Sequence, residues 1–473
     1  MLAAPNSLKA ELQHVHQTNQ DLGFGGWKQT FNFQLSTFNG KTSFAVNIEL
    51  INTGTELMLG RVLNTHQQWI CRQLADRGYV VARQVCVADA GRDIQLAVRE
   101  ALARADLIIT TGGLGPTSDD LTRDLIAALL GKKLREDPAV LANVEGFFAA
   151  RKRPMPSRTR VQALVPDGAM VLHNRHGTAP GLAVEIDPNP FRDDRKASWL
   201  ILLPGPPREL KPMFGEQVLP LILERFPRPT AFVSRTLRTT GLGESMIEEK
   251  IAAALKPLTD AGLELGYCAR TGEVDVRFAF RGTGAEQSVA EAEQIVRRLI
   301  GAHVFGEGDE QLDAVIVRLL TERNQTLVLA ESCTGGFLAN RLTNVPGASA
   351  VLLAGLVTYS NAAKQKFLDV RAGTLAQHGA VSEAVAREMA EGARRQTGAD
   401  YALAVTGIAG PGGGTPDKPV GTVFIALATG RHTFVLNPIN RYDRETFKFV
   451  TSQQALELLW RTVLNQIRIT NHQ

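Results

Sequence analysis

Apolar runs alternate with amphipathic segments along the chain from about residue 45. The runs at 45–54, 79–89 and 106–113 have the character of buried strands, and the segments at 63–77 and 92–105 between them have the apolar spacing of helices. Strands that alternate with helices in this way form a mainly parallel sheet with helices on both faces. We therefore predict an α/β domain in the first part of the chain.

The pattern changes twice further along. Residues 225–308 contain a strand-like RTLRTTG, a helical GESMIEEKIAAAL, a strand-like EVDVRFAFRG and another helix, which predicts a small α+β domain. The stretch WLILLPGPPRELKPMF before it is predicted to be a strand that runs into a loop. From Gln311 the α/β alternation returns, with the strand-like TLVLAES, AVLLAGLVTYS, DYALAVTG and GTVFIALATG. The predicted domains are 44–218, 225–308 and 312–470, after a poorly ordered extension at 1–43.

Composition and charge narrow the class of protein. The 473 residues, 44% hydrophobic and 21% charged, are typical of a globular protein of ~2–4 domains. The net charge of +4, from 52 basic and 48 acidic residues, includes no basic block, so no direct nucleic-acid partner is expected. No stretch approaches the ~20 apolar residues of a membrane span, and no membrane partner is expected. The four scattered cysteines form no CxxC pair and fit a reducing cytoplasm.

A serine stands between a predicted strand and a predicted helix in the segment AESCTGG. Backbone N–H groups at the start of a helix are unpaired and can hold an anion or an oxyanion, so Ser332 is a candidate nucleophile. The alternative is that Ser332 or Thr334 only caps the helix, which both residue types do well.

The next strand-to-helix segment, VTYSNAAK, adds a phenol and an amine. A serine needs a base to become a nucleophile, and a lysine whose pKa is lowered by burial can serve, with a tyrosine hydroxyl as proton relay. Lys364 and Tyr359 are the candidates for these roles. The alternative for Lys364 is a solvated charge on a helix.

A glycine-rich segment, TGIAGPGGGT, begins at Thr406 after a further predicted strand. Glycine allows the backbone to approach a ligand closely and to offer N–H donors, so a phosphate or a ribose can rest here. The alternative is a flexible surface loop.

Together, ESCTGG, YSNxxK and TGIAGPxGG…KPVGTV resemble the CinA C-terminal domain over nearly all of residues 312–470. The resemblance implies a nicotinamide mononucleotide deamidase, which attacks the carboxamide carbon, expels ammonia and hydrolyses the acyl-enzyme to nicotinate mononucleotide without a metal or other cofactor. It also implies roles for four residues: Ser332 as nucleophile, Lys364 as general base, Tyr359 as proton relay and Thr406 as a polar contact near the amide. The expected substrate contacts are Thr334, Gly335, Asn361, Gly407, Gly410 and Gly412.

Two strands of the first domain end in glycine-containing turns, TGTE and TGGLGP. Ligands of open α/β sheets bind at the carboxyl ends of strands, where these turns are expected to lie. Gly112, Gly113 and Gly115 can admit a diphosphate to the start of a helix that we predict near Asp119. Asp119 and Asp120 beside an anion suggest a hard divalent cation. The alternative is that the two acids only meet the dipole of the helix.

The segments GTEL, TTGGLGPTSDDLT and LPGPP resemble the molybdopterin-binding fold of MoaB-like and MogA-like proteins, as found at the front of CinA chains. The resemblance implies an ADP-ribose pyrophosphatase that depends on Mg²⁺, Mn²⁺ or Co²⁺. The expected site contains Glu56, Gly112, Gly113, Gly115, Asp119 and Asp120, with Asp119 and Asp120 as metal ligands. His66 departs from the pattern, because a small amide or hydroxyl residue is expected there. The middle region resembles the small domain between the halves of CinA chains, for which we expect a homodimer or interdomain role.

Two other functions remain open. The first domain permits molybdopterin binding or transfer, although the complete serine site argues against this as the main role. A competence- or DNA-damage-linked interaction protein is the second, and the absence of a basic stripe argues against direct DNA binding. The preferred prediction is a cytoplasmic hydrolase with nicotinamide mononucleotide and ADP-ribose as partners.

Overall fold

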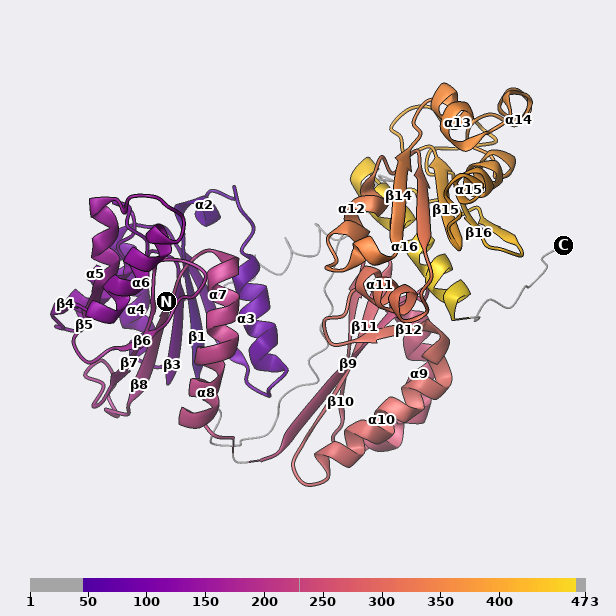
Figure 1. Cartoon of the computed structure of the whole chain (residues 1–473). Coiled ribbons are helices and arrows are strands. Elements are labelled where there is room, and N and C mark those ends of the chain that lie inside the picture. The colour runs from indigo at the N-terminus through magenta and orange to yellow at the C-terminus, as the bar shows by residue number, and fades with distance from the viewer. Residues whose placement is uncertain (1–45, 229, 465–473) are drawn as a thin grey trace, which may run out of the picture. The chain divides into compact units, whose positions relative to one another are not determined.

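The computed structural model describes residues 46–228 and 230–464 (Figure 1). The predicted extension at 1–43 lies outside these residues. The α/β fold class is confirmed, with sheets of six, four and five strands and one two-stranded ribbon. None of the helices in the described ranges is long and apolar enough to cross a membrane.

The first sheet has the order β2-β1-β3-β8-β7-β6, and its first four strands are parallel, as the alternation predicts. β7 and β6 are antiparallel additions. The strands are β1 (Ile48–Thr53), β2 (Val81–Val87), β3 (Leu107–Thr111), β6 (Met170–Leu172), β7 (Gly181–Ile186) and β8 (Ser198–Leu203), and β4 (Leu134–Glu136) pairs with β5 (Leu164–Pro166). The helices are α2 (Thr55–Met58), α3 (Thr65–Ala75), α4 (Gly91–Leu102), α5 (Thr122–Leu129), α6 (Pro138–Ala149), α7 (Pro207–Met213) and α8 (Leu219–Arg225).

Helices cover both faces of this sheet because the strands are apolar on both sides. Leu50 packs into the cluster that holds α3, α7 and α8, whereas Ile51 packs into the cluster that holds α4, α5 and α6. Successive strand residues point to opposite faces, so a continuous apolar run such as β1 serves both clusters.

Two local predictions for this domain are wrong. α5 begins at Thr122 rather than near Asp119, so Asp119 and Asp120 lie in the turn before the helix. Asp120 accepts a hydrogen bond from the Thr117 N–H at 2.9 Å, which closes that turn instead of capping α5. After β8 the chain enters α7 almost at once rather than a loop, because Pro207 at the first helical position has a backbone angle suited to a helix.

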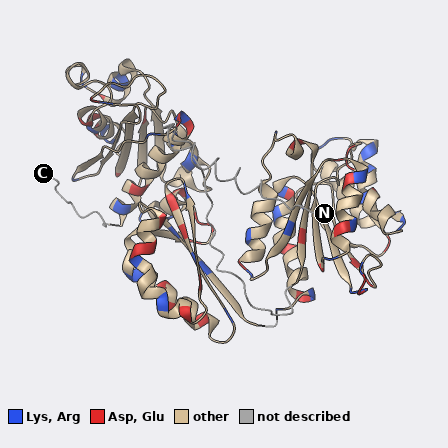
Figure 2. Cartoon of the chain, turned by 180° about the vertical axis from the view of Figure 1, so that it is seen from behind, with Lys and Arg blue, Asp and Glu red and all other residues tan. Residues whose placement is uncertain are grey.

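The middle domain has an antiparallel sheet with the order β10-β11-β9-β12. Its elements are β9 (Phe232–Thr240), α9 (Glu244–Asp260), β10 (Glu264–Arg270), β11 (Glu273–Arg281), α10 (Ala285–Ile300) and β12 (Val304–Glu307). The two helices pack their apolar sides on one sheet face, with Ile251 and Val296 against Phe278. Both helices carry acidic and basic residues, with no long basic run (Figure 2).

The third sheet has the order β14-β13-β15-β16-β17, of which β14, β13 and β15 are parallel and β16 and β17 antiparallel. The strands are β13 (Leu327–Glu331), β14 (Leu352–Val357), β15 (Tyr401–Gly407), β16 (Val423–Ala428) and β17 (Thr433–Leu436). The helices are α11 (Leu312–Glu322), α12 (Phe337–Thr343), α13 (Asn361–Leu368), α14 (Ala372–His378), α15 (Glu383–Thr397) and α16 (Arg444–Val463).

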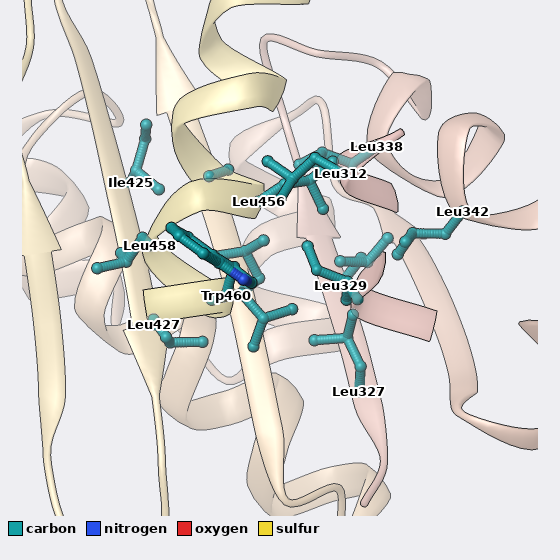
Figure 3. Close-up of a cluster of buried hydrophobic side chains, with 14 of the residues drawn as sticks. Leu312, Leu327, Leu329, Leu338, Leu342, Ile425, Leu427, Leu456, Leu458 and Trp460 are labelled. Atoms are coloured by element: carbon teal, nitrogen blue, oxygen red, sulfur yellow. The ribbon is translucent and has the colours of Figure 1, made fainter. Parts of the chain in front are cut away.

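Close packing on both faces fixes the elements that carry the third domain's polar residues. On one face Trp460 and Leu456 of α16 pack with Leu329 of β13 (Figure 3). On the other face α15 passes so close to α13 that a methyl group on Gly392 would lie 1.8 Å from the carbonyl oxygen of Leu368. The end of α13 is therefore held against α15, because well-packed interiors leave little freedom to shift.

Candidate active site

Ser332 lies at the carboxyl end of β13, beside β15. Its N–H donates to the carbonyl of Val405 at 2.9 Å, so the neighbouring strand holds its backbone. The side chain of Ser332 is 8% exposed. The serine therefore sits at the sheet edge where ligands of α/β folds bind, with a narrow opening to solvent.

The carboxylate of Glu331 accepts hydrogen bonds from backbone amides at the start of α12. Glu331, the last residue of β13, is fully buried and accepts hydrogen bonds from the N–H groups of Gly336 at 3.0 Å, Leu338 at 3.1 Å and Ala339 at 2.9 Å. The prediction that the N–H groups at the start of this helix are unpaired is therefore wrong.

The hydroxyls of the turn do not cap α12 either. The Ser332 hydroxyl contacts Lys364, and the buried Thr334 hydroxyl has no hydrogen-bond partner in the described chain. The Gly335 N–H donates to the carbonyl of Ser332. Within the described residues, the amides of Cys333 and Thr334 are left without an oxygen acceptor.

Lys364 of α13 is buried against this turn. Its Nζ lies 3.0 Å from Ser332 Oγ, 2.8 Å from the carbonyl oxygen of Thr358 and 3.4 Å from that of Tyr359. The side chain is 1% exposed, and burial lowers the pKa of its amine. No carboxylate of the described chain forms an ion pair with it. Lys364 is therefore not a solvated helix charge, and a neutral amine is the form that burial favours.

The Tyr359 hydroxyl points elsewhere. It accepts a hydrogen bond from the Arg444 guanidinium at 2.8 Å, and the residue is 61% exposed. Arg444 also donates to the carbonyl of Gly410 at 2.8 Å, so it joins the tyrosine to the glycine-rich segment. The proton relay through Tyr359 stays a prediction, but its hydroxyl contacts neither Ser332 nor Lys364 in the described structure. The sequence reasoning missed Arg444, which follows no local motif.

The glycine-rich segment leaves β15 beside the serine turn. Thr406 is buried and its hydroxyl donates to the carbonyl of Ala380 at 2.8 Å. Lys418 donates to the carbonyls of His378 at 2.8 Å and Val381 at 2.7 Å. Both side chains thus bind the glycine-rich segment to the connection between α14 and α15. The Thr406 hydroxyl already donates its proton there.

The remaining predicted substrate contacts are spread around this edge. Asn361 is the exposed first residue of α13, and Gly335 is exposed in a left-handed conformation with φ +62°. Gly407 ends β15, Gly410 is buried beside Arg444, and Gly412 is exposed. The structure therefore gathers the serine, lysine and glycine segments at one sheet edge, and the contacts themselves stay predictions.

The thiol beside the serine is unsuited to act as a nucleophile. Cys333 is 6% exposed, and burial raises the pKa of its thiol to about 12. The thiolate is the reactive form of cysteine, so this side chain remains protonated near neutral pH.

The glycine turns of the first domain also come together. A methyl group on Gly112 would lie 2.7 Å from the carbonyl oxygen of Thr53, and one on Gly205 would lie 3.8 Å from the Gly112 Cα. The turn after β3 thus lies against the ends of β1 and β8. Next to it, the buried Thr122 hydroxyl has no partner in the described chain and would be 2.0 Å from a methyl group on Gly113. Only glycine fits at positions 112 and 113.

The two predicted metal ligands, Asp119 and Asp120, lie in the turn before α5. Asp120 is engaged with the N–H and hydroxyl of Thr117, and its carboxylate lies against Gly115. Asp119 is exposed, and Glu56 is exposed and folded back over its own turn. No group of three or more His, Cys, Asp or Glu side chains in the described residues is placed to hold a metal ion. Mg²⁺ at a phosphate site is usually held by one or two carboxylates together with phosphate oxygens and water, so the role of these acids as metal ligands stays a prediction.

His66, the residue that departs from the expected pattern, lies in the first turn of α3. Its Nε2 is buried without a partner in the described chain, and burial lowers the pKa of its imidazole. A neutral ring is therefore favoured at this position.

Three family models match consecutive parts of the chain. They are the "Probable molybdopterin binding domain" over residues 49–224, the "Damage-inducible protein CinA KH domain" over 234–306 and the "CinA C-terminal domain" over 309–463. A solved structure of the competence/damage inducible protein CihA from Agrobacterium tumefaciens is 39% identical over 33% of this chain and 98% of its own, with a TM-score of 0.31.

Relatives match this chain over most of its length and over nearly all of their own. A CinA-like protein of Akkermansia muciniphila is 43% identical over 87% of this chain and 96% of its own length. A CinA-like protein of Gemmatimonas aurantiaca is 39% identical over 88% of this chain and 96% of its own length. With a molybdopterin-binding-type domain, a KH-type domain and a CinA C-terminal domain in this order, the chain belongs to the CinA family.

Proposed function

We propose that the C-terminal domain hydrolyses the carboxamide of nicotinamide mononucleotide to give nicotinate mononucleotide and ammonia. The observation that carries the proposal is the 3.0 Å contact between Ser332 Oγ and the amine of Lys364, a buried lysine whose pKa is lowered. A serine with a neutral amine at this distance has the nucleophile and the base that amide cleavage needs.

The surroundings of Lys364 suit a neutral amine. An uncharged amine has two N–H donors and one lone pair. The carbonyls of Thr358 and Tyr359 can accept the two donors, which leaves the lone pair for the hydroxyl proton of Ser332. Because this contact is direct, the first proton transfer needs no relay through Tyr359.

The reaction then proceeds in two stages. Ser332 Oγ bonds to the carboxamide carbon as its proton passes to Lys364, and Lys364 returns that proton to the leaving nitrogen as the C–N bond breaks and ammonia departs. Water attacks the resulting ester and gives one proton to Lys364, which passes it to Ser332 Oγ as the ester C–O bond breaks. The carboxylic acid that is released then ionises to the carboxylate. No redox change or additional reactant is involved.

Two further groups suit the rest of the substrate. The amides of Cys333 and Thr334 follow the nucleophile directly; they donate toward the Cys333 sulfur and have no oxygen acceptor in the described chain, so they can turn to the developing oxyanion. Arg444, which is held between Tyr359 and Gly410, supplies a positive charge for the phosphate of the nucleotide. A nucleotide amide therefore matches the site better than an uncharged amide.

Incubation of the purified chain with nicotinamide mononucleotide tests the proposal. Nicotinate mononucleotide and ammonia are expected in equal amounts, and a chelator is expected to leave the rate unchanged, because the proposed steps use only side chains and water. Failure to form nicotinate mononucleotide at any enzyme concentration contradicts the proposed function.

ADP-ribose cleavage in the first domain is a second candidate. It is favoured by the buried, unpartnered Thr122 hydroxyl beside the glycine turn, since such a group costs about 1–3 kcal/mol unless a ligand or water satisfies it. The metal would be held by Asp119 or Asp120 together with the diphosphate, and we derive no step through it.

The test of this second candidate is incubation with ADP-ribose and Mg²⁺, Mn²⁺ or Co²⁺. AMP and ribose 5-phosphate are expected as products. Excess chelator is expected to stop this cleavage and to spare deamidation, which separates the two domains. Absence of both products with all three metals contradicts the pyrophosphatase assignment.

A further inference from the structure

Glu331 forms hydrogen bonds with the segments that carry Ser332 and Lys364. Its side chain accepts three amides from the turn and helix that follow Ser332, at 2.9 to 3.1 Å. Its backbone carbonyl accepts the N–H of Thr358 at 2.8 Å, and the carbonyl of Thr358 in turn accepts the amine of Lys364 at 2.8 Å. A single residue thus connects the segment that carries Ser332 with the segment that holds Lys364.

The burial of this carboxylate makes the connection stiff. Glu331 is fully buried, and only N–H groups balance its charge, since no cationic side chain of the described residues pairs with it. Charge-assisted hydrogen bonds of this kind are about twice as strong as neutral ones, and an ion left unpaired in the interior is costly. The glutamate therefore has one low-energy arrangement, and the turn is fixed with it.

A simple helix cap does not require a glutamate here. Serine, threonine, asparagine and aspartate are the usual caps and bond one or two amides at the start of a helix. Glu331 reaches from the last position of a strand across the serine turn to Leu338 and Ala339 inside α12. Such a reach fixes the turn between its two ends, at Ser332 and at α12.

We infer that Glu331 is a positioning residue for amide cleavage: it holds Ser332 Oγ at 3.0 Å from Lys364 without touching the substrate. This role rests on the proposed function of the C-terminal domain. Glu331 acts on catalysis through the geometry of the serine and the lysine, so its loss slows the chemical step and leaves substrate binding nearly unchanged.

Glu331→Gln is the sharpest variant. A carboxamide keeps the shape of the side chain but has one oxygen and one NH₂ group, so at most two of the three amides stay bonded and the third meets a donor. We expect kcat to fall about 10- to 100-fold, with KM within about twofold of the original value. Loss of positioning affects the transition state more than the bound substrate, which accounts for this split.

Glu388→Gln is the matched control. Glu388 is another mostly buried glutamate of the same domain. It accepts the N–H of Arg371 at 2.9 Å and the hydroxyl of Thr374 at 2.7 Å at the start of α14, and unlike Glu331 it also pairs with a guanidinium, that of Arg371. Its loss is expected to lower Tm by a similar amount to Glu331→Gln. A kcat within about twofold of the original is expected for this control.

A fluorophosphonate probe separates this inference from the choice of substrate. Ser332 Oγ bonds to phosphorus, fluoride leaves, and the hydroxyl proton passes to Lys364, so the reaction needs the same serine–lysine geometry without the nucleotide. We expect mass spectrometry to find the label on Ser332, and the labelling rate to be about tenfold slower in Glu331→Gln and unchanged in Glu388→Gln. If the original chain is labelled but does not deamidate the nucleotide, the proposed function fails while the labelling rates still test the role of Glu331.

Three outcomes overturn the inference. One is a folded Glu331→Gln variant with kcat and labelling rate both within about twofold of the original. Another is an equal loss of activity in Glu388→Gln. The third is that Glu331→Gln and Glu331→Asp both lack the near-UV circular dichroism of the original chain at 4 °C, which would make Glu331 a residue of folding stability alone.

Discussion

Replacement of Ser332 by alanine is expected to abolish ammonia release from nicotinamide mononucleotide. The variant loses the only atom that bonds to the carboxamide carbon, and the loss of a nucleophile costs on the order of 10³-fold or more in rate. The fold should persist, because the backbone of Ser332, which donates to Val405, is unchanged by the substitution. Among the described side chains, the hydroxyl forms a hydrogen bond with Lys364 alone. Initial rates of ammonia release, with Tm measured on the same samples, check this result.

Ser452→Ala provides a control for the deletion of a serine hydroxyl from this domain. Ser452 is buried in α16, donates to the carbonyl of Phe449 at 2.7 Å and accepts from Arg341 at 2.8 Å. Its loss should cost about 1 kcal/mol of stability and leave the rate nearly unchanged. If Ser332→Ala keeps more than about a tenth of the activity at an unchanged Tm, Ser332 is not the nucleophile.

The elements with a strong period in sequence are the ones the sequence predicts well. In β13, Leu329 packs toward α16 while Val328 packs toward α15, which is the two-sided apolar pattern of a buried parallel strand. β10 (Glu264–Arg270) was not identified because its residues are mostly half-buried and carry no clear alternation. A continuous apolar run therefore reveals a strand that is buried on both faces, whereas a half-buried strand without alternation gives no such signal.

Some residues of the site can be predicted from the sequence and others cannot. Ser332 and Lys364 lie in short motifs and are found from the sequence, and the structure brings them into contact. Arg444 is 34 residues from Gly410 and 85 from Tyr359, and only the fold joins them. Glu331 lies in the same motif as Ser332, but its partners are backbone amides, which every residue type except proline has, so the sequence does not indicate them. For Asp119 and Asp120 the sequence leaves two interpretations open, because adjacent acids look alike whether they bind a metal or close a turn.

The rate of deamidation is expected to rise with pH through an apparent pKa below the ~10.4 of a free lysine. Only the neutral amine of Lys364 can accept the proton of Ser332, so the active fraction grows as the amine loses its proton. Burial lowers the pKa of Lys364, so at any given pH a larger fraction of its amine is neutral than in a free lysine. The dependence of kcat on pH measures this pKa in the bound complex.

The same shift has a consequence for stability with a definite sign. In the window between the lowered folded pKa and ~10.4, the unfolded chain binds a proton that the folded chain does not, so the free energy of unfolding rises with pH. Lys364→Met removes this titrating group. The rise in Tm with pH across that window should therefore be smaller in Lys364→Met than in the original chain, independently of any activity.

Lys364→Arg is expected to be nearly inactive, on the order of 10³-fold or more below the original rate, because a guanidinium stays charged and cannot accept the serine proton. The matched control is Lys366→Arg on the same helix, where the lysine is exposed and lies over the ring of Phe367. Its rate should stay within about twofold of the original, because an exposed charge is exchanged for another. An active Lys364→Arg variant would remove Lys364 from the mechanism. The same conclusion would follow if Lys364→Met kept the pH dependence of kcat of the original chain, and Ser332 would then be without its base.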